Sequence, residues 1–381
     1  MGISIFSFFS GSGLLDLAFE HPELDFNIVL VNEYNKSFLD AYKYVRKIGN
    51  LPAPMYGHYC CDINDFLQKE DTSSQLRLYV AEQRKIGNIV GFIGGPPCPD
   101  FSVGGKNQGR DGQNGVLAKS YIDLIIKHKP DFFFFENVTG LVKTAKHKEY
   151  FNELKSSLQS AGYIISDTVL NSLSFGVPQD RERVVMIGIQ NTNKLSIPIT
   201  NSGELMFPWL RYALFDADEV KMLDWPKEQP YKEKSRRSFK YQVPKVLTVQ
   251  HWFTVNNVRR HPNAKDVFQV KAGKAKMLQV FEGDTSRKSF KRLHRWRYSP
   301  TAAYGNNEVH LHPYETRRLS VSEVMAIQSL PDWFCLPTKM SLTHKFKTIG
   351  NGVPYLMALA ISRAINDFLH DIFGGVNKRD G

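Results

Sequence analysis

Residues 3 to 20 read ISIFSFFSGSGLLDLAFE. The apolar run at 3–9 predicts a buried strand, the two glycines predict a tight turn, and LLDLAFE predicts a helix. The same order of strand and helix recurs along the first half of the chain. Further strands are predicted by FNIVLVNE (26–33), NIVGFIGG (88–95) and DFFFFENV (131–138), and further helices by residues 117–128 and 148–161. This alternation predicts an α/β fold with a mostly parallel, doubly wound sheet.

Length and composition indicate a globular chain in a reducing compartment. A chain of 381 residues can bury a large core, and 42% hydrophobic and 23% charged residues are ordinary for a globular protein. No apolar stretch approaches the roughly 20 residues of a membrane span, and the N-terminus lacks the basic region of a signal peptide. The four cysteines show neither a CxxC pair nor zinc-site spacing, so we expect no metal site and a cytoplasmic location.

The positive charge of the chain is concentrated in one segment. Residues 194–310 contain 22 Lys and Arg against 11 Asp and Glu, whereas the rest of the chain holds 27 of each. A basic field confined to one part of a protein is typical of a site for a polyanion such as nucleic acid. A charge-rich face exposed to water would give the same count.

The alternation of strands and helices breaks at about residue 192 and returns near the C-terminus. We therefore predict one Rossmann-like α/β domain formed by residues 1–193 and 334–381. Residues 194–310 would form a smaller, irregular, β-containing domain inserted into it, and residues 311–333 would be a hinge. The last helix, in GNGVPYLMALAISRAINDFLHDIF (350–373), is expected to pack back on the N-terminal sheet.

The residues with chemical potential follow the predicted strands, where doubly wound sheets bind their ligands. They are Ser10 to Gly13, Glu33, Cys98 and Glu136. The stretch GGPPCPDFS (94–102) places Cys98 between two prolines. Proline restricts the backbone, and a cysteine in such a rigid frame suits a nucleophile that must meet a substrate at a fixed angle better than it suits a core residue.

Each of these features also has a simpler explanation. The glycine-rich turn suits a nucleotide, but a tight strand-to-helix turn needs the same glycines. Glu33 could bind ribose hydroxyls and Asp62 an adenine amino group, or both could be surface acids or helix caps. Glu136 follows four phenylalanines, so burial would favour a protonated carboxyl that donates to a substrate nitrogen; the alternative is a structural pair with an arginine.

These stretches, in this order, resemble the cytosine-5 DNA methyltransferase family of the bacterial restriction-modification type. The resemblance covers nearly the whole chain outside the basic segment. The stretches that carry it are FSFFSGSGLLDLAFE (6–20), VNEYN (31–35), CDI (61–63), GGPPCPDFS (94–102), FFFFENV (132–138), VPQDRERV (177–184) and IGNGVP (349–354).

The resemblance implies an enzyme that transfers a methyl group from S-adenosylmethionine to C5 of cytosine. Cys98 would add to C6, Glu136 would hydrogen-bond N3 and the exocyclic amine, and Arg183 with Arg181 would hold O2. The implied contacts to the cofactor come from Phe9, Ser10, Gly11, Ser12, Gly13, Glu33, Tyr34, Asp62, Ile63, Pro97, Leu117 and Asn351.

The resemblance further implies double-stranded DNA as the substrate, with the target cytosine swung out of the helix. The basic segment 194–310 would hold phosphates and read bases, and the glycine-rich residues 99–115 would close as a lid. In RKSFKRLHRWR (287–297), six Arg and Lys residues with Phe290 and Trp296 could contact the DNA backbone; the alternative is a surface strand with its aromatics in the core. We expect a monomer in the bacterial cytoplasm or nucleoid, paired in function with a restriction endonuclease.

Three other functions fit the sequence less well. The tRNA-methylating branch of the family carries a Cys-Phe-Thr signature and a short recognition region, and this chain has neither. A cysteine hydrolase would need a histidine partnered with Cys98 near a strand end, and the eleven histidines fall in no such context. A DNA-binding module that has lost catalysis would not be expected to retain Cys98, Glu136 and both arginines.

Overall fold

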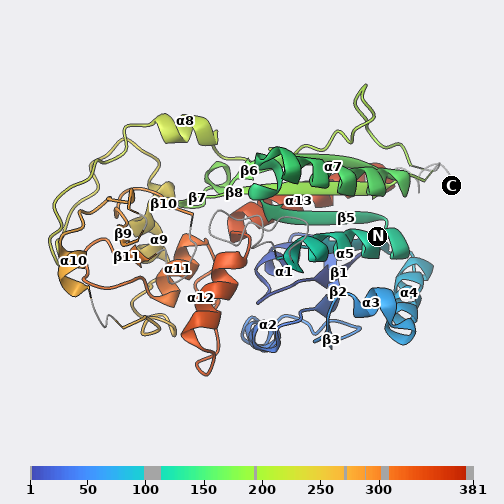
Figure 1. Ribbon diagram of the computed structural model, residues 1–381, viewed down its shortest axis with the longest axis horizontal. Coiled ribbons are helices and arrows are strands. Elements are labelled where there is room, and N and C mark those ends of the chain that lie inside the picture. The colour runs from blue at the N-terminus through green and yellow to red at the C-terminus, as the bar shows by residue number, and fades with distance from the viewer. Residues whose placement is uncertain are drawn as a thin grey trace.

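The computed structural model describes residues 2–97, 113–192, 195–269, 273–287, 289–301 and 309–374. A seven-stranded sheet with the order β3-β2-β1-β4-β5-β8-β6 forms the centre of one lobe (Figure 1). Its strands are β1 (Ile3–Phe8), β2 (Phe26–Asn32), β3 (His58–Tyr59), β4 (Ile89–Gly94), β5 (Phe132–Val138), β6 (Tyr163–Asn171) and β8 (Glu182–Gln190).

The prediction of a mostly parallel sheet is confirmed. Strands β1 to β5 pair in parallel, whereas β8 is antiparallel to both of its neighbours, β5 and β6. The exception follows from the connection between β6 and β8, which contains only the short 3₁₀ helix η3 (Ser172–Phe175) and the two-residue strand β7 (Gln179–Asp180). A parallel neighbour would need a crossover of a dozen or more residues.

Both faces of the sheet are covered by helices. The four phenylalanines of β5 alternate between the faces: Phe132 and Phe134 pack in one hydrophobic cluster, and Phe133 and Phe135 in the other. The helices of this lobe are α1 (Leu14–Phe19), α2 (Lys36–Ile48), α3 (Asp65–Gln68), α4 (Glu70–Lys85), α5 (Gln113–His128), α6 (Gly140–Lys143), α7 (Ala145–Ser160) and α13 (Tyr355–Phe373).

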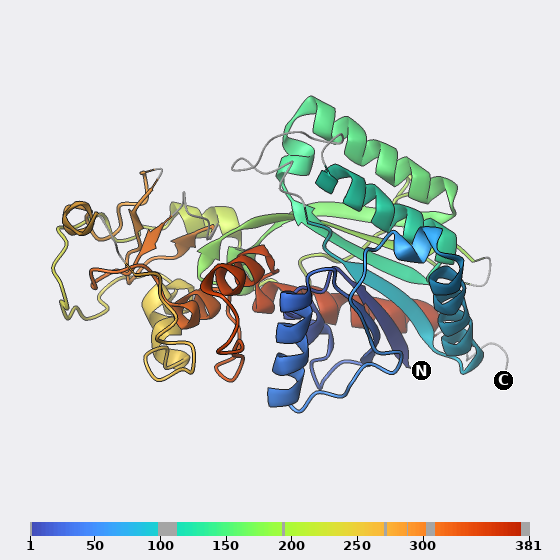
Figure 2. The ribbon, with the colours of Figure 1, turned by 60° about the horizontal axis from the view of Figure 1, so that its bottom comes forward.

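Helix α13 returns to the sheet, as the sequence predicts. Its residues Met357, Ile361 and Ile365 pack in the same cluster as Ile3 and Ile5 of β1. Figure 2 shows α13 running along the sheet beside the helices of the N-terminal half. The C-terminal helix is thus part of the lobe that the N-terminal strands build.

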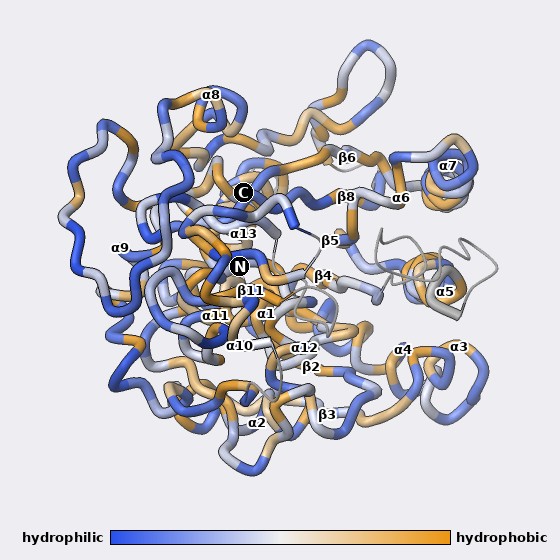
Figure 3. The backbone as a smooth tube through the Cα atoms, turned by 60° about the vertical axis from the view of Figure 1, so that its left-hand side comes forward, coloured by the Kyte–Doolittle hydropathy of each residue, from blue (hydrophilic) through white to orange (hydrophobic). Residues whose placement is uncertain are grey.

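The second lobe begins after the stretch of Leu205 and Phe207, which packs on the sheet of the first lobe, and it is irregular (Figure 2). The chain beside α9 is mostly hydrophilic, whereas the sheet of the first lobe is hydrophobic (Figure 3). The elements after β8 are α8 (Ala217–Met222), η4 (Lys245–Leu247), α9 (Val249–Val255), α10 (Lys274–Leu278), β9 (Lys291–Arg292), β10 (Ser299–Pro300), β11 (His310–Leu311), α11 (Val321–Ile327) and α12 (Leu342–Asn351).

The two lobes share a hydrophobic cluster. Leu14 of α1 and Val45 of α2 pack in one cluster with Phe253 of α9, Val324 of α11 and Phe346 of α12. Burial of this apolar surface holds the second lobe against the helices that follow β1 and β2. The elements α11 and α12 therefore support both lobes.

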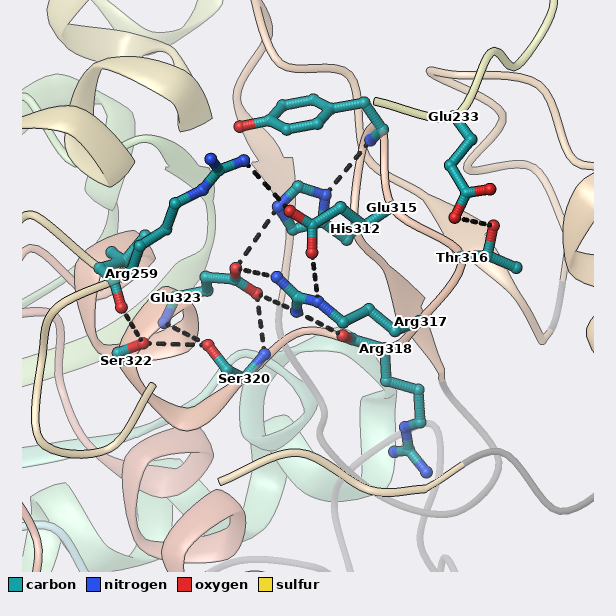
Figure 4. Close-up of polar contacts among 12 residues, drawn as sticks. Glu233, Arg259, His312, Glu315, Thr316, Arg317, Arg318, Ser320, Ser322 and Glu323 are labelled. Carbon is teal, nitrogen blue, oxygen red and sulfur yellow. Dashed lines mark hydrogen bonds and ion pairs between the residues drawn. The ribbon is translucent and has the colours of Figure 1, made fainter. Parts of the chain in front are cut away.

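The start of α11 is fixed by a buried polar network, drawn in Figure 4. Glu323 accepts hydrogen bonds from Arg317 (2.6 Å) and lies 3.4 Å from His312, and its carboxylate completes a capping box with Ser320. Burial opposes ionisation of Glu323, but the charges of His312 and Arg317 outweigh it and hold its pKa well below the usual range. Arg318, in contrast, points away from this network (Figure 4) and stacks on the ring of Phe268 at 4.7 Å.

Candidate active site

The predicted site residues that the structure describes gather at the carboxyl ends of the parallel strands. The turn of residues 9–13 follows β1, Glu33 follows β2, Gly95 and Pro96 follow β4, and Glu136 lies near the end of β5. Strands β1, β4 and β5 are adjacent in the sheet. Their ends form the edge at which an open α/β sheet binds its ligand.

The turn after β1 adopts a backbone that requires glycine. Phe9, Gly11 and Gly13 all have positive φ angles, of 55°, 57° and 89°. A Cβ at Gly13 would come within 2.9 Å of the ring of Tyr42, whereas the nearest atom to a Cβ at Gly11 would be Thr348 Oγ1 at 3.6 Å. No residue larger than glycine therefore fits at position 13. Phe9 is held in a backbone conformation that non-glycine residues rarely adopt, and such conformations are common at functional sites.

Glu33 ties the turn to the neighbouring strand. Its carboxylate accepts hydrogen bonds from the backbone N–H of Gly11 at 2.9 Å and from that of Asn35 at 2.7 Å. Burial raises the pKa of Glu33 above its usual value, although the two N–H groups act in the opposite direction. Because each carboxylate oxygen keeps a further lone pair, Glu33 can still accept a hydrogen bond from a ligand.

The other predicted cofactor residues lie around this turn with different exposures. Tyr34 is 73% exposed, and the Asp62 carboxylate accepts a hydrogen bond from the backbone of Asn64 at 2.8 Å. The side chain of Ile63 is buried in the core, so its backbone alone can face a ligand. Leu117 is half-buried against the same core, and Pro97 and Asn351 are exposed.

Helix α12 brings Asn351 to the turn, although the chain between them is long. Thr348 donates a hydrogen bond to the hydroxyl of Ser12 at 3.0 Å. Arg181, only 1% exposed, donates through Nη2 to the carbonyl groups of Gly350 (2.8 Å) and Gly352 (3.0 Å), which flank Asn351. The arginine therefore fixes the end of α12 beside the glycine-rich turn.

Glu136 and Arg183 form a buried ion pair between β5 and β8. The Nε of Arg183 lies 2.8 Å from Oε1 of Glu136, and both side chains are less than a tenth exposed. Burial raises the pKa of Glu136, with Arg183 and Arg181 opposing the rise; burial likewise lowers the pKa of Arg183. The pairing expected as the simpler explanation for Glu136 is present, and it places both charged groups at the ligand edge of the sheet.

The residues that precede Cys98 lie against Glu136 and its neighbour Asn137. A Cβ on Gly95 would lie 2.8 Å from Oε2 of Glu136, so only glycine allows so close an approach. The side chain of Asn137 donates to the carbonyl of Pro96 at 3.3 Å. Cys98 itself and residues 99–112 of the predicted lid lie outside the described residues.

Sequence reasoning missed several residues that shape the site. Four residues contact the predicted motifs although the sequence patterns do not indicate them: Asp16, Tyr42, Asn137 and Thr348. Asn137 lies inside the ENV motif, and a signal for it existed there. Thr348 and Tyr42 meet the turn only through the tertiary fold, so no local pattern could have identified them.

Two negative findings concern the described part of the chain. Within it, no three His, Cys, Asp or Glu side chains are grouped so that they could hold a metal ion. None of its helices combines the length and the apolar character needed to cross a membrane.

Comparisons with known proteins agree with the geometry. The family model described as C-5 cytosine-specific DNA methylase matches residues 3–367. The Type II methyltransferase M.NmeDI of Neisseria meningitidis serogroup C is 49% identical over 379 residues, which cover 99% of this chain and 86% of that protein. The Type II methyltransferase M.MthTI of Methanothermobacter thermautotrophicus is 28% identical, with 98% and 99% of the two chains covered.

Two solved structures share the fold. A prophage-encoded DNA modification methyltransferase from E. coli matches with a TM-score of 0.61 at 22% identity, covering 97% of this chain and all of the other. The S. pombe Dnmt2 methyltransferase matches with a TM-score of 0.56 at 12% identity, covering 97% and 99%. The match of the family model over nearly the whole chain and the 49% identical relative lead to one conclusion: this chain belongs to the C-5 cytosine-specific DNA methylase family and is a DNA cytosine-5 methyltransferase.

Proposed function

We propose that Cys98 adds to C6 of a cytosine swung out of double-stranded DNA, so that C5 becomes nucleophilic enough to accept a methyl group. The observation that carries this assignment is the packing of Gly95 and the tethering of Pro96 against Glu136 and Asn137. Gly95 and Pro96 precede Cys98 by three and two residues in GGPPCPDFS. The nucleophile and the acidic group would then meet the same base.

Glu136 and Arg183 would act on the cytosine ring. Because burial raises the pKa of Glu136, its carboxyl keeps a proton to a higher pH than an exposed glutamate would. A protonated carboxyl can donate to N3 while its other oxygen accepts from the exocyclic amine. Arg183, 2.8 Å away, would orient that carboxyl and donate to O2. Arg181 would support the pair from behind, since its own Nη2 is bound to carbonyls of residues 350 and 352.

We propose S-adenosylmethionine as the methyl donor, which supplies an electrophilic methyl group on a sulfonium ion. The chain has a fitting site: among the described residues only Thr348 Oγ1, at 3.6 Å, would lie near a Cβ at Gly11, and the carboxylate of Glu33 accepts from the N–H of Gly11 at 2.9 Å. The residues proposed to hold the cofactor are Phe9, Ser10, Gly11, Ser12, Gly13, Glu33, Tyr34, Asp62, Ile63, Pro97, Leu117 and Asn351.

The second lobe would bind the DNA. We propose residues 1–193 and 334–381 as the catalytic domain, 194–310 as the recognition domain and 311–333 as the segment that connects them. The excess positive charge of 194–310 supports this division. The shared cluster around Phe253 and Val324 would keep the recognition domain at a fixed place beside the catalytic edge.

We also propose the biological setting. The protein would be a monomer in the bacterial cytoplasm that protects DNA against a companion restriction endonuclease. The relatives named Type II methyltransferases support the restriction setting alone. Methylation of tRNA is not favoured, because the matching family is described as acting on DNA.

Trapping with a 5-fluorocytosine oligonucleotide tests the proposal. Fluorine at C5 cannot leave as a proton would, so the adduct between Cys98 and C6 should accumulate when S-adenosylmethionine is supplied, and denaturing electrophoresis with mass spectrometry would locate it. The Cys98→Ala variant should bind S-adenosylmethionine but form no adduct. An adduct on another residue, or full turnover by Cys98→Ala, would disprove the role of Cys98.

A further inference from the structure

A carboxylate lies buried directly beneath the glycine-rich turn. Asp16, on α1, is 1% exposed. It accepts a hydrogen bond from the hydroxyl of Ser7 at 2.7 Å and another from that of Tyr42 at 2.8 Å. Aspartate is rarely so deeply buried, and none of the roles assigned above uses it.

The hydrogen bonds of Asp16 continue into the turn with a defined direction. An ionised carboxylate can only accept, so Ser7 must give its proton to Asp16. The acceptors within reach of the single hydroxyl hydrogen of Ser10 are then the hydroxyl of Ser7 at 2.9 Å and the carbonyls of Asn32 at 3.2 Å and Ser7 at 3.3 Å. The carbonyl of Ser10 in turn accepts from the N–H of Gly13 at 2.9 Å. The ionised state of Asp16 thereby fixes the proton of Ser7 and leaves the oxygen of Ser7 as the nearest acceptor for the hydroxyl of Ser10.

Tyr42 links Asp16 to the same turn from the other side. Its ring packs against the backbone of Gly13 so closely that a Cβ there would not fit, and this contact supports the turn. Its hydroxyl donates to Asp16 and accepts from Nη1 of Arg46 at 3.1 Å. A cavity of about 10 Å³, room for about one water, is lined by these residues together with Ser12 and Glu20.

The charges around Asp16 leave the site negative. Arg46 is paired with Glu20 at 2.7 Å, so these two cancel and Asp16 remains as the uncompensated charge. The ring of His58, 5.7 Å from that of Tyr42, is kept neutral because burial lowers its pKa to about 4. Glu33 adds a second carboxylate on the outer side of the turn, where the charge of Lys347 acts on it. Such a site favours a ligand with positive groups.

The ionised Asp16 does not stabilise the fold at neutral pH. Burial raises its pKa to about 6 from 3.8, although its bonds to Ser7 and Tyr42 and the charge of Arg46 act against the rise. When folding raises the pKa of a carboxyl group, its favourable contribution to stability is complete below the unfolded pKa, here 3.8, and is lost as pH rises through the folded pKa of about 6. A charged group that lowers stability at working pH is best explained by a role in function.

We propose that Asp16 is a positioning residue for the methyl donor, holding the turn of residues 9–13 in its binding shape and making the site attractive to the cationic sulfonium and ammonium groups. The inference rests on the proposed binding of S-adenosylmethionine at this turn. It concerns affinity for the cofactor and not the chemistry at cytosine, because Asp16 lies beneath the turn and the ion pair of Glu136 lies at β5.

The test compares Asp16→Asn with a matched buried acid elsewhere. Asp16→Asn should raise the dissociation constant for S-adenosylmethionine about tenfold, as expected for loss of a charge-assisted network, measured by calorimetry on the full chain. Its Tm at pH 8 should equal or exceed that of the wild type. Glu282→Gln breaks a buried pair with Arg295 (2.7 Å) in the second lobe, and should lower Tm while the affinity for S-adenosylmethionine stays unchanged.

The pH profile gives a second readout. Wild-type affinity should fall as pH drops through about 6, where Asp16 gains a proton, and this step should be absent from Asp16→Asn. Glu33 is retained in both proteins, so the difference between the two curves isolates Asp16. Tyr42→Phe, which keeps the ring but removes one donor, should weaken binding by a smaller factor and serves if Asp16→Asn does not fold.

The outcomes separate this inference from the proposed function. If the wild type does not bind S-adenosylmethionine, the proposed cofactor is wrong. If the wild type binds it and Asp16→Asn and Tyr42→Phe bind equally well, Asp16 has no positioning role. A clear fall in Tm of Asp16→Asn at pH 8, with unchanged affinity, would assign the carboxylate to stability alone.

Discussion

Glu136 and Arg183 face each other at 2.8 Å across two antiparallel strands, and water reaches less than a tenth of either side chain. Breaking a buried pair leaves the remaining charge uncompensated. At the same time, the burial that makes this arrangement costly raises the pKa of the carboxyl. One substitution can therefore report on both the chemistry and the fold.

Glu136→Gln should slow methyl transfer at least about 100-fold in a single-turnover assay with labelled cofactor, in the range expected for loss of a general acid. The amide keeps the shape of the side chain but cannot supply an acidic proton. Because Asp16 and the turn are untouched, the affinity for the cofactor should not change. A variant with the wild-type transfer rate would show that the carboxyl takes no part in the reaction.

The pH dependence of Glu136 has a definite sign. A raised pKa means that the acid form persists to higher pH, and that its contribution to stability is lost as pH rises through the raised value. The rate of addition should consequently decline at high pH in the wild type. The Glu136→Gln variant should be much slower, and its rate should show no decline at high pH. If the decline persists in this variant, it arises from the titration of another group.

Arg181→Lys is predicted to weaken cofactor binding about fivefold, since a lysine cannot reproduce the fixed planar geometry of the guanidinium. The reason lies in the two carbonyls of residues 350 and 352, which Arg181 holds on either side of Asn351. Equilibrium titration with S-adenosylmethionine provides the measurement.

Arg183→Lys is the matched control for Arg181→Lys. It should leave the affinity for the cofactor unchanged and reduce the rate of methyl transfer, because Arg183 is bound to Glu136. The reverse result, in which Arg181→Lys loses rate but keeps cofactor affinity, would support the role at O2 of cytosine that the family resemblance implies.

The basic segment contains arginines of two kinds. Arg292 is fully buried, with hydrogen bonds to the carbonyls of Val280, His312 and Met277, and Arg295 is paired with Glu282. Neither can reach a DNA phosphate. The sequence-based expectation that all six cations of residues 287–297 contact DNA is therefore wrong for these two, because the protein itself satisfies their donors.

Substitutions should distinguish the arginines that are bound within the protein from those that are exposed to solvent. Arg236 is exposed in the second lobe, and Arg236→Gln should weaken DNA binding and reduce the slope of log K against log salt by about 0.9 if it neutralises one phosphate. Arg292→Met should lower Tm without changing that slope. Lys148→Gln, at an exposed site on α7, is a control for loss of charge; an equal change of slope there would contradict a DNA site confined to the second lobe.

The positions of the strand ends in the candidate site were predictable from one local pattern and one general rule about α/β sheets. Apolar runs identified β1, β2, β4 and β5, and the rule that ligands bind at carboxyl ends then placed Ser10, Glu33 and Glu136 together. The split of the four phenylalanines between two faces follows from the same period of two.

The rest depends on contacts between distant parts of the chain. Arg181 meets residues 350 and 352, and Thr348 meets Ser12, in pairings that no spacing in the sequence suggests. Helix α12 was not predicted, because its stretch LTHKFKTIGN offers few apolar positions and contains a glycine. A count of charges likewise cannot distinguish an arginine such as Arg292, bound to main-chain carbonyls, from one that faces solvent.

Lys345 of α12 and Asp266 of the second lobe form a further pair whose removal has a predictable cost. The ammonium group, on a side chain 1% exposed, lies 2.6 Å from a carboxylate that also accepts from Asn263. Asp266→Asn leaves the buried ammonium uncompensated and should lower the free energy of unfolding by about 3 kcal/mol, measured with urea. Lys345→Met removes the charge and fills the space with an apolar chain, so it should cost less, and adding Asp266→Asn to it should cost little more. Equal losses from the two single variants, adding fully in the double variant, would show that the ion pair does not hold α12 to the second lobe.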